Sequence, residues 1–103
     1  ACELFDMITH VVLMRLRPGL DANSAVAQDA HRAMLALPGK IAQIRDLQCG
    51  FNLTPDVRAW DYVLIAHFDS ETQMLEYFEH PAHLAVVAQW EPIAELAFGD
   101  LAH

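Results

Sequence analysis

A chain of 103 residues is long enough for one domain and too short for two. Its 14 acidic residues outnumber its 6 lysines and arginines, and the resulting net charge of −8 would be repelled by nucleic-acid phosphates and by anionic lipid. Hydrophobic residues make up 54% of the chain, which excludes intrinsic disorder and predicts apolar surface that one copy cannot bury. We therefore expect a self-associating protein with neither nucleic acid nor membrane as a partner.

The cysteines and the start of the chain bear on compartment and domain limits. Cys2 and Cys49 are too few for a disulfide framework, and no secretory signal pattern opens the chain, so we expect a cytoplasmic setting. Periodic sequence begins at Met7. Residues 1–6 are therefore expected to be an N-terminal extension or a cloning remnant, and residues 7–103 to form the domain.

Residues 8–17 are rich in Ile, Val and Leu and predict the first strand. One of its faces carries His10, Val12 and Met14. The opposite face is also mostly apolar, so both faces of this strand should be covered.

A helix is predicted next, with Asp21 or Asn23 as its N-cap, and a Pro-Gly pair at 38–39 ends it. Its apolar stripe recurs at helical spacing and consists of Val26, Ala30, Ala33, Met34 and Leu37.

Two more strands follow, over residues 44–53 and 60–68, with Gly50 as a candidate bulge and residues 54–59 as a long connection. One face of the later strand should carry Tyr62, Leu64, Ala66 and Phe68.

Ser70 and Gln73 have the spacing of a capping box, which predicts a short helix. Its inward side chains are expected to be Met74, Leu75 and Phe78. His80-Pro81 breaks this helix and a second one follows, because the residue before proline is pushed out of the helical region. Residues 93–101 are expected to form the last strand.

The element order β-α-β-β-α-β predicts an α+β, ferredoxin-like fold, with an antiparallel sheet and its helices on one face. Both faces of the first strand are mostly apolar and should be buried, whereas the helices cover only one face of the sheet. We therefore expect a homodimer in which a second copy covers the open face of the sheet.

Histidine is the residue type that points to chemistry, with six in the chain. If the inward face of the first strand meets the helices, His10 could approach Tyr77 and His83, and a polar cluster in an apolar pocket suits proton transfer. We expect His67 to face the dimer side and His31 and His103 to be exposed.

Two other interpretations of the histidines remain open. His80 and His83 have a metal-ligand spacing, but Pro81 should make their rings diverge and no third ligand is evident, so neither metal nor cofactor is expected. Alternatively, the role is purely structural: His80 sits where a helix cap belongs, and either imidazole can satisfy backbone groups at the helix break. Cys49 is expected to be an unreactive strand cysteine, since no neighbouring cation lowers its pKa.

Several segments together resemble one known family. They are MITHVVLM at residues 7–14, LALPG at 35–39, GFNLTP at 50–55 and, above all, HPAH at 80–83 following Tyr77. In order and spacing they resemble the stress-responsive A/B barrel domain, Dabb, of the dimeric α+β barrel superfamily. The resemblance implies a homodimer whose two sheets form an α/β barrel, and it covers residues 7–103.

The resemblance also implies a site. A few plant relatives are enzymes, a polyketide cyclase and a hydroxynitrile lyase, whereas most members have no assigned reaction. In cyclase-like members a first-strand histidine, a tyrosine and the second histidine of the HPxH motif line a pocket, and these match His10, Tyr77 and His83.

The function expected from these observations is a small apolar pocket for a small organic ligand, with cyclase-like or lyase-like proton transfer. His83 would be the general base, Tyr77 the donor to a developing oxyanion, and His10 a positioning group. The expected pocket lining is Val12, Met14, Val26, Met34, Phe78, Val86 and Trp90. The alternative is a non-catalytic dimerisation or stress-associated module with structural histidines.

Overall fold

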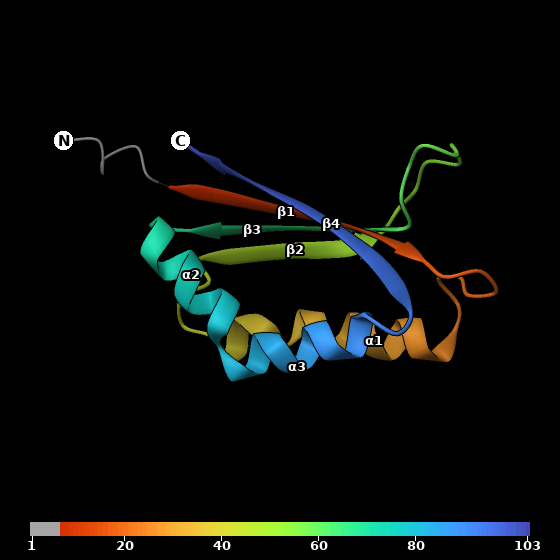
Figure 1. The fold of residues 1–103 in the computed structure, drawn as a ribbon, viewed down its shortest axis with the longest axis horizontal. Helices are drawn as coiled ribbons and strands as arrows, with labels where there is room; N and C mark the ends of the chain where they lie inside the picture. The colour runs from red at the N-terminus through yellow and green to blue at the C-terminus, as the bar shows by residue number, and fades with distance from the viewer. Residues whose placement is uncertain (1–6) are drawn as a thin grey trace.

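The structure, a computed structural model, describes residues 7–103, so the expectation for residues 1–6 lies outside it. In chain order its elements are β1 (Ile8–Leu16), α1 (Ala25–Leu35), the 3-10 turn η2 (Leu37–Gly39), β2 (Asp46–Phe51), β3 (Tyr62–Phe68), α2 (Glu71–Glu79), α3 (Pro81–Trp90) and β4 (Ala94–Ala102). Figure 1 shows the helices packed together on one side of the sheet. This is the predicted α+β, ferredoxin-like fold.

The sheet has four strands in the order β2-β3-β1-β4, and every neighbouring pair is antiparallel. β1 is therefore a central strand, bonded to β3 on one side and to β4 on the other. The predicted last strand is confirmed, and it pairs with β1 from Ile8 opposite Ala102 to Leu16 opposite Ala94.

β2 is shorter than predicted, and Gly50 is not a bulge. The ladder between β2 and β3 runs without interruption, and Gly50 lies directly opposite Val63. Ile44 is buried but precedes the strand, in a turn where its N–H donates to the carbonyl of Ile41 at 3.3 Å.

α1 differs from its prediction at the N-terminus and in one stripe residue. Its N-cap is Ser24, because Asp21 uses its side chain in the preceding turn, where it accepts from the N–H of Asn23 at 2.8 Å. Val26 is 48% exposed, whereas the neighbouring Ala27 is fully buried. The small alanine allows close approach of helix and sheet, and one residue along the chain rotates Val26 about 100° away.

α2 presents Met74 and Tyr77 to the core, and Leu75, which was predicted to point inward, is 51% exposed. Ser70 caps the helix as predicted, since its hydroxyl accepts from the N–H of Gln73 at 3.2 Å. The inward pattern follows the helical three-residue spacing from Met74 to Tyr77 rather than residue hydrophobicity alone.

The predicted break between α2 and α3 is confirmed at His80, which is extended, with φ −65° and ψ 134°. Its Nδ1 accepts from the N–H of Ala82 at 3.0 Å, so His80 acts as the N-cap of α3 and Pro81 is that helix's first residue. One residue thus ends one helix and starts the next.

The core lies between the sheet and the helices and follows the strand alternation. From β1 and β3 the buried side chains are Ile8, His10, Val12, Met14, Leu16, Tyr62, Leu64, Ala66 and Phe68. Trp90 of α3 is fully buried, and its ring centroid lies 4.6 Å from that of Tyr62.

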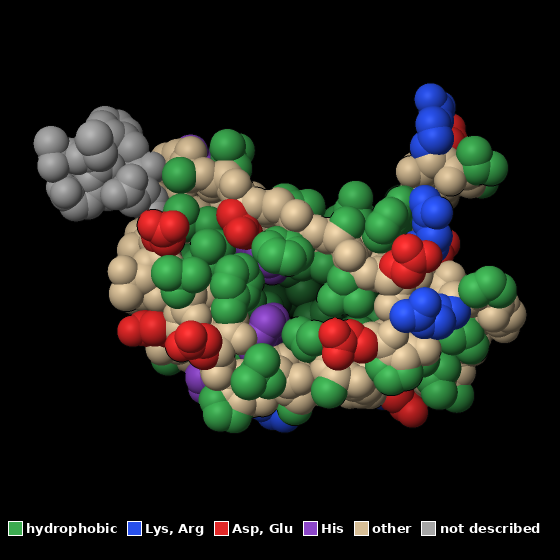
Figure 2. Space-filling model, in the orientation of Figure 1, with side chains coloured by type: hydrophobic (Ala, Val, Ile, Leu, Met, Phe, Trp, Pro, Cys, Tyr) green, Lys and Arg blue, Asp and Glu red, His purple; other side chains and the backbone are tan. Residues whose placement is uncertain are grey.

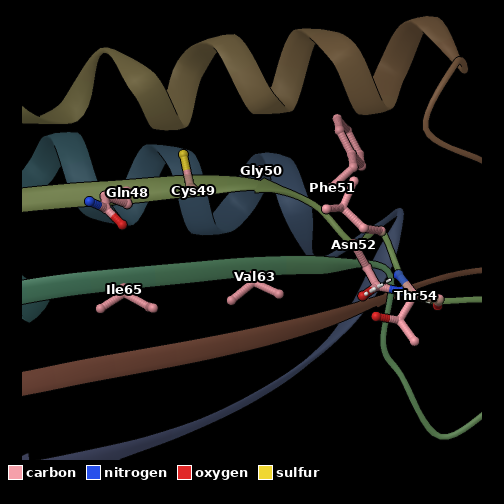
Figure 3. A pocket seen from close by; sticks show the side chains of 9 residues that line it. Gln48, Cys49, Gly50, Phe51, Asn52, Thr54, Val63 and Ile65 are labelled. Carbon is pink, nitrogen blue, oxygen red and sulfur yellow. Dashed lines mark hydrogen bonds between the residues drawn. The ribbon is translucent and has the colours of Figure 1, made fainter.

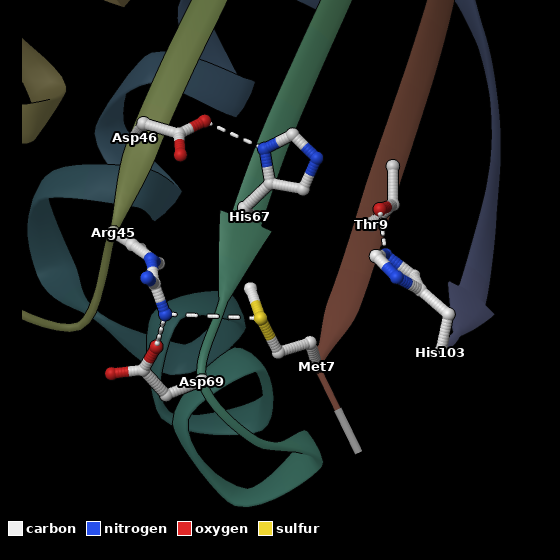
Figure 4. A network of polar contacts seen from close by, with 7 residues as sticks. All are labelled: Met7, Thr9, Arg45, Asp46, His67, Asp69 and His103. Carbon is white, nitrogen blue, oxygen red and sulfur yellow. Dashed lines mark hydrogen bonds and ion pairs between the residues drawn. The ribbon is translucent and has the colours of Figure 1, made fainter. Parts of the chain in front are cut away.

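The opposite face of the sheet carries no helix and is apolar at its centre. Val11, Val63 and Ile65 are half-buried there, and Leu13 is 37% exposed. At one end this face is polar, where His67 pairs with Asp46 at 2.6 Å (Figure 4).

Two histidines were predicted to be exposed. His103 is exposed, whereas His31 is not. The hydroxyl of Thr9 lies 2.6 Å from Nε2 of His103 (Figure 4). His31 is half-buried because its Nδ1 lies 2.6 Å from the hydroxyl of Tyr62, at the point where α1 packs on β3.

Within residues 7–103, no helix combines the length and the apolar character needed to cross a membrane.

Replacing Ser70 by Ala should lower the free energy of unfolding by about 1 kcal/mol, because an amide of the first turn of α2 loses its capping acceptor. Urea unfolding at one protein concentration measures this. The matched control is Ser24→Ala. The Ser24 hydroxyl accepts from the N–H of Asp21 at 2.9 Å, in the exposed turn before α1, and from no amide of α1, so its loss should cost less. Equal costs for the two variants would contradict the assigned cap.

Candidate functional site

The three residues expected to act together come from three elements and do converge. His10 lies on β1, Tyr77 on α2 and His83 near the start of α3. The ring centroids of Tyr77 and His83 are 4.2 Å apart, and those of His10 and Tyr77 are 6.0 Å apart. The sheet–helix interface therefore holds a compact cluster of two imidazoles and a phenol.

His10 is 3% exposed and pairs with a carboxylate that sequence analysis did not single out. Its Nδ1 donates to Oδ1 of Asp100 at 2.6 Å, since a carboxylate can only accept. Asp100 faces His10 directly in the ladder between β1 and β4. The pair fixes the ring of His10 and leaves its Nε2 for other partners.

His83 has the arrangement of a base. Its Nδ1 donates to the backbone carbonyl of Phe78 at 3.1 Å, which leaves the lone pair of the neutral ring on Nε2. Burial lowers the pKa of His83 below its usual value, and nearby His10 and His80 add to this, while the bond to Phe78 opposes it. The imidazole is therefore neutral near pH 7.

Tyr77 is 1% exposed, and burial raises the pKa of its hydroxyl well above the usual range, with Cys49 adding to the shift. The phenol therefore stays protonated near pH 7, and its hydroxyl can act as a hydrogen-bond donor. Within residues 7–103, no protein group is hydrogen-bonded to that hydroxyl.

Two hollows that share part of their walls lie at this cluster. The inner cavity has a volume of about 40 Å³ and is bordered by His10, Tyr77 and His83. The outer cleft has a volume of about 340 Å³, shares His10 and His83 with the cavity, and opens to the surface. Figure 2 shows the opening between strands and helices, with histidine atoms in its wall.

The apolar walls match most of the expected lining. The inner cavity is bordered by Val12, Met14, Met34, Val86 and Trp90, and Phe78 borders the outer cleft. Val26 borders neither hollow, which corrects that expectation. Five bordering residues were not in the expected lining: Leu64, Val87, Glu91, Leu96 and Phe98.

Phe98 and Leu96 come from the part of β4 that the helices do not cover. Phe98 is 65% exposed, and its ring centroid lies 5.7 Å from that of His10. No signal in one sequence shows that these side chains border the cleft, because that depends on the register between β4 and β1.

Other chemistry receives less support from the geometry. Cys49 is half-buried, and burial raises the pKa of its thiol, which opposes nucleophilic reactivity. His80 and His83 both use Nδ1 in bonds to backbone groups. In the described part of the chain, no three His, Cys, Asp or Glu side chains gather where they could hold a metal ion.

The lowered pKa of His83 makes stability depend on pH. When the pH falls below 6.5, the usual pKa of histidine, the unfolded chain binds a proton at His83, whereas the folded chain binds it only at lower pH. The free energy of unfolding of wild type minus that of His83→Gln should therefore fall as pH falls below about 6.5. Urea unfolding at a fixed protein concentration measures the difference, and a rise on acidification would contradict the assigned shift.

Known proteins share this architecture. The chain is 32% identical over 94 residues to an uncharacterized protein of Streptomyces coelicolor, with 91% of this chain and 97% of that one covered. A crystal structure from Bacteroides fragilis, described as a dimeric protein of unknown function with a ferredoxin-like fold, has a TM-score of 0.82 and 30% identity, covering 94% of this chain and 96% of that one.

A hydroxynitrile lyase from Passiflora edulis has a TM-score of 0.83 at 14% identity, with 96% of this chain and 94% of that chain covered, which is a likeness of fold alone. The family model described as "Stress responsive A/B Barrel Domain" matches residues 8–99. The chain belongs to the stress-responsive A/B barrel domain family.

Proposed function

We propose that this chain is a homodimer in which each copy binds a small organic carbonyl compound between sheet and helices and transfers a proton to or from it. The observation that carries the proposal is the convergence of His10, Tyr77 and His83 on one cavity, which shares walls with a mostly apolar cleft. A base, a donor and an oriented imidazole in a mostly apolar pocket are the parts that such chemistry needs.

The roles follow from the proton each group holds. Nε2 of His83 removes a proton from the carbon next to the carbonyl, and the electron pair moves onto the carbonyl oxygen. The Tyr77 hydroxyl donates a hydrogen bond to that oxygen, and His10, fixed by Asp100, orients the substrate. If the proton returns to carbon, the substrate has only exchanged it. In the cyclase-like version the enolate carbon instead bonds to a second carbonyl carbon of the same substrate, and the alkoxide formed there takes the proton back from His83.

The lyase-like version uses the same base. His83 would take the hydroxyl proton of a hydroxynitrile while the bond to the nitrile carbon breaks, giving a carbonyl compound and cyanide. The hydroxynitrile lyase that shares this fold makes this version worth testing, although the likeness extends only to the fold.

The sizes of the two hollows limit the ligand. The inner cavity, of about 40 Å³, has room for only a few atoms, so the proposal places just the reacting group of the ligand there. The outer cleft of about 340 Å³ has Phe78, Phe98 and Leu96 in its walls and suits an aromatic or alkyl body. The proposed ligand class is therefore a small, mostly apolar carbonyl compound.

The proposed dimer interface is the face of the sheet that carries no helix. Val11, Leu13, Val63 and Ile65 form its apolar centre, and leaving them in water would forgo their burial free energy. The dimeric state described for the 30% identical structure supports a homodimer for this chain.

A second candidate is the non-catalytic module, and a specific observation favours it. His80 caps α3, and His83 donates to the carbonyl of Phe78, so both histidines satisfy backbone groups at the helix break. In that case the two histidines would stabilise the helix break, and the site would have no catalytic role.

Proton abstraction can be tested without knowing the natural substrate. Wild type should be stabilised against heat by acetophenone, which has an enolisable methyl group, and should speed exchange of its methyl protons in D₂O, followed by NMR. His83→Gln should slow this exchange by about 100-fold or more, since a positioned base contributes about 10²–10⁴-fold. Mandelonitrile cleavage tests the lyase-like version with the same variants.

The matched control is His67→Gln, which removes an imidazole on the opposite face of the sheet and should exchange like wild type. If wild type is folded but neither binds acetophenone nor accelerates exchange or cleavage, the catalytic proposal fails and the structural module is favoured.

The interface is tested by Leu13→Arg, which places a charge on the centre of the open sheet face. Its dimer dissociation constant, from sedimentation velocity, should rise by about 100-fold or more, because a charge would have to be buried in each copy. Leu84→Arg, at a 53% exposed position on α3, is the control. A dimer unaffected by Leu13→Arg would place the interface elsewhere.

A further inference from the structure

The connection between β2 and β3, residues 52–61, stands out from the molecule as an arm. In Figure 1 it rises from the end of the sheet away from the helices, and in Figure 2 its tip stands clear of the rest of the surface. Its two large aliphatic side chains, Leu53 and Val57, are 95% and 96% exposed. No other large hydrophobic residue among residues 7–103 is as exposed.

The arm is held in shape by its own hydrogen bonds. The N–H of Asn52 donates to the carbonyl of Asp61 at 2.9 Å and closes its base. At its tip, Nε and Nη2 of Arg58 donate to the carboxylate of Asp56 at 3.1 and 2.9 Å. The two aliphatic side chains are therefore presented in a fixed arrangement, which lowers the entropy lost when they bind.

The foot of the arm overhangs the open face of the sheet. A hollow of about 440 Å³ lies there between the arm, at Leu53 and Thr54, and the sheet, at Val63 and Ile65. Figure 3 shows Cys49 and Phe51 pointing toward α1, whereas Val63 and Ile65 point to the other side. The arm is thus a wall at one end of the face proposed as the dimer interface.

The same face has a second apolar hollow, of about 500 Å³, over β1 and β4. Leu13 and Ala97, which face each other in the ladder, border it, as does Leu101, which is 64% exposed. Gly99 contributes no side chain, so this part of the sheet is open to a side chain from outside.

We infer that in the homodimer, and resting on the sheet-face interface proposed above, the arm of each copy closes over the second copy. Leu53 and Val57 pack into the partner's hollow over β1 and β4, near Leu13 and Ala97. The contact occurs twice, once for each arm, because a twofold interface uses the same surfaces on both copies.

Strand order supplies the geometric reason. When two sheets stack face to face about a twofold axis parallel to their strands, the order β2-β3-β1-β4 runs in opposite directions in the two copies. The β2 edge, which carries the arm, then lies over the β4 edge of the partner. The arm leaves the sheet at Phe51 and Tyr62. Met14 lies at the same end of the sheet, because it pairs with Tyr62 on one side and with Leu96 on the other. The neighbouring pair along β1 and β4 is Leu13 and Ala97.

Charge favours an apolar contact between copies over an ionic one. Each copy has a net charge of −8, so two copies repel each other at long range. Moreover, the Arg58 charge at the arm tip is already paired with Asp56 within the same copy. The aliphatic side chains of the arm are what remains to bind the second copy, so the dimer should not weaken in high salt.

The test is the double variant Leu53→Ser, Val57→Ser, with the dimer dissociation constant measured by sedimentation velocity beside wild type. We expect a rise of about 100-fold or more, because four aliphatic side chains lose their contact in each dimer. The matched control is Leu35→Ser, Leu84→Ser, which replaces two aliphatic residues, each 53% exposed, on the helices. The control should dimerise like wild type.

The outcomes separate the arm from the interface beneath it. If Leu13→Arg dissociates the dimer and the arm variant does not, the sheet-face dimer stands and the arm inference is overturned. A monomeric wild type overturns both. If the arm variant dissociates the dimer but Leu13→Arg does not, the arm binds a different part of the second copy, and the assigned hollow over β1 and β4 is wrong.

Discussion

The central position of β1 is the constraint on which the rest of the structure depends. A strand hydrogen-bonded on both edges cannot shift its register. The alternation of its side chains therefore fixes the face of the sheet on which each residue lies. His10 is thereby placed in the core beside Tyr77 and opposite Asp100, while Leu13 is placed on the open face. The same strand thus specifies both the pocket and the surface for a second copy.

Local sequence signals were sufficient for features that depend on a few neighbouring residues. The helix break at His80-Pro81 and the cap at Ser70 rest on proline geometry and on one hydroxyl, and both agree with the structure. The inward stripe of β3 follows from strict alternation. These features are readable because the physical cause and its effect lie within four residues of each other.

Features set by packing or register were missed. Val26 and Leu75 were expected inside on hydrophobicity, yet Ala27 and Tyr77 are buried in their place, because helix–sheet distance and rotation decide which residue fits. Asp100 is 90 residues from His10, and only the β1–β4 register joins them. Likewise, the cleft walls from β4 depend on how far that strand extends beyond the helices.

The shared cap at His80 has a consequence for how the family can vary in length. His83 lies three residues after a cap that ends α2 and begins α3, and its ring is anchored to Phe78 across that break. One inserted residue would turn the imidazole by about 100° about the helix axis and carry it away from Tyr77. Insertions and deletions should therefore be excluded at this junction.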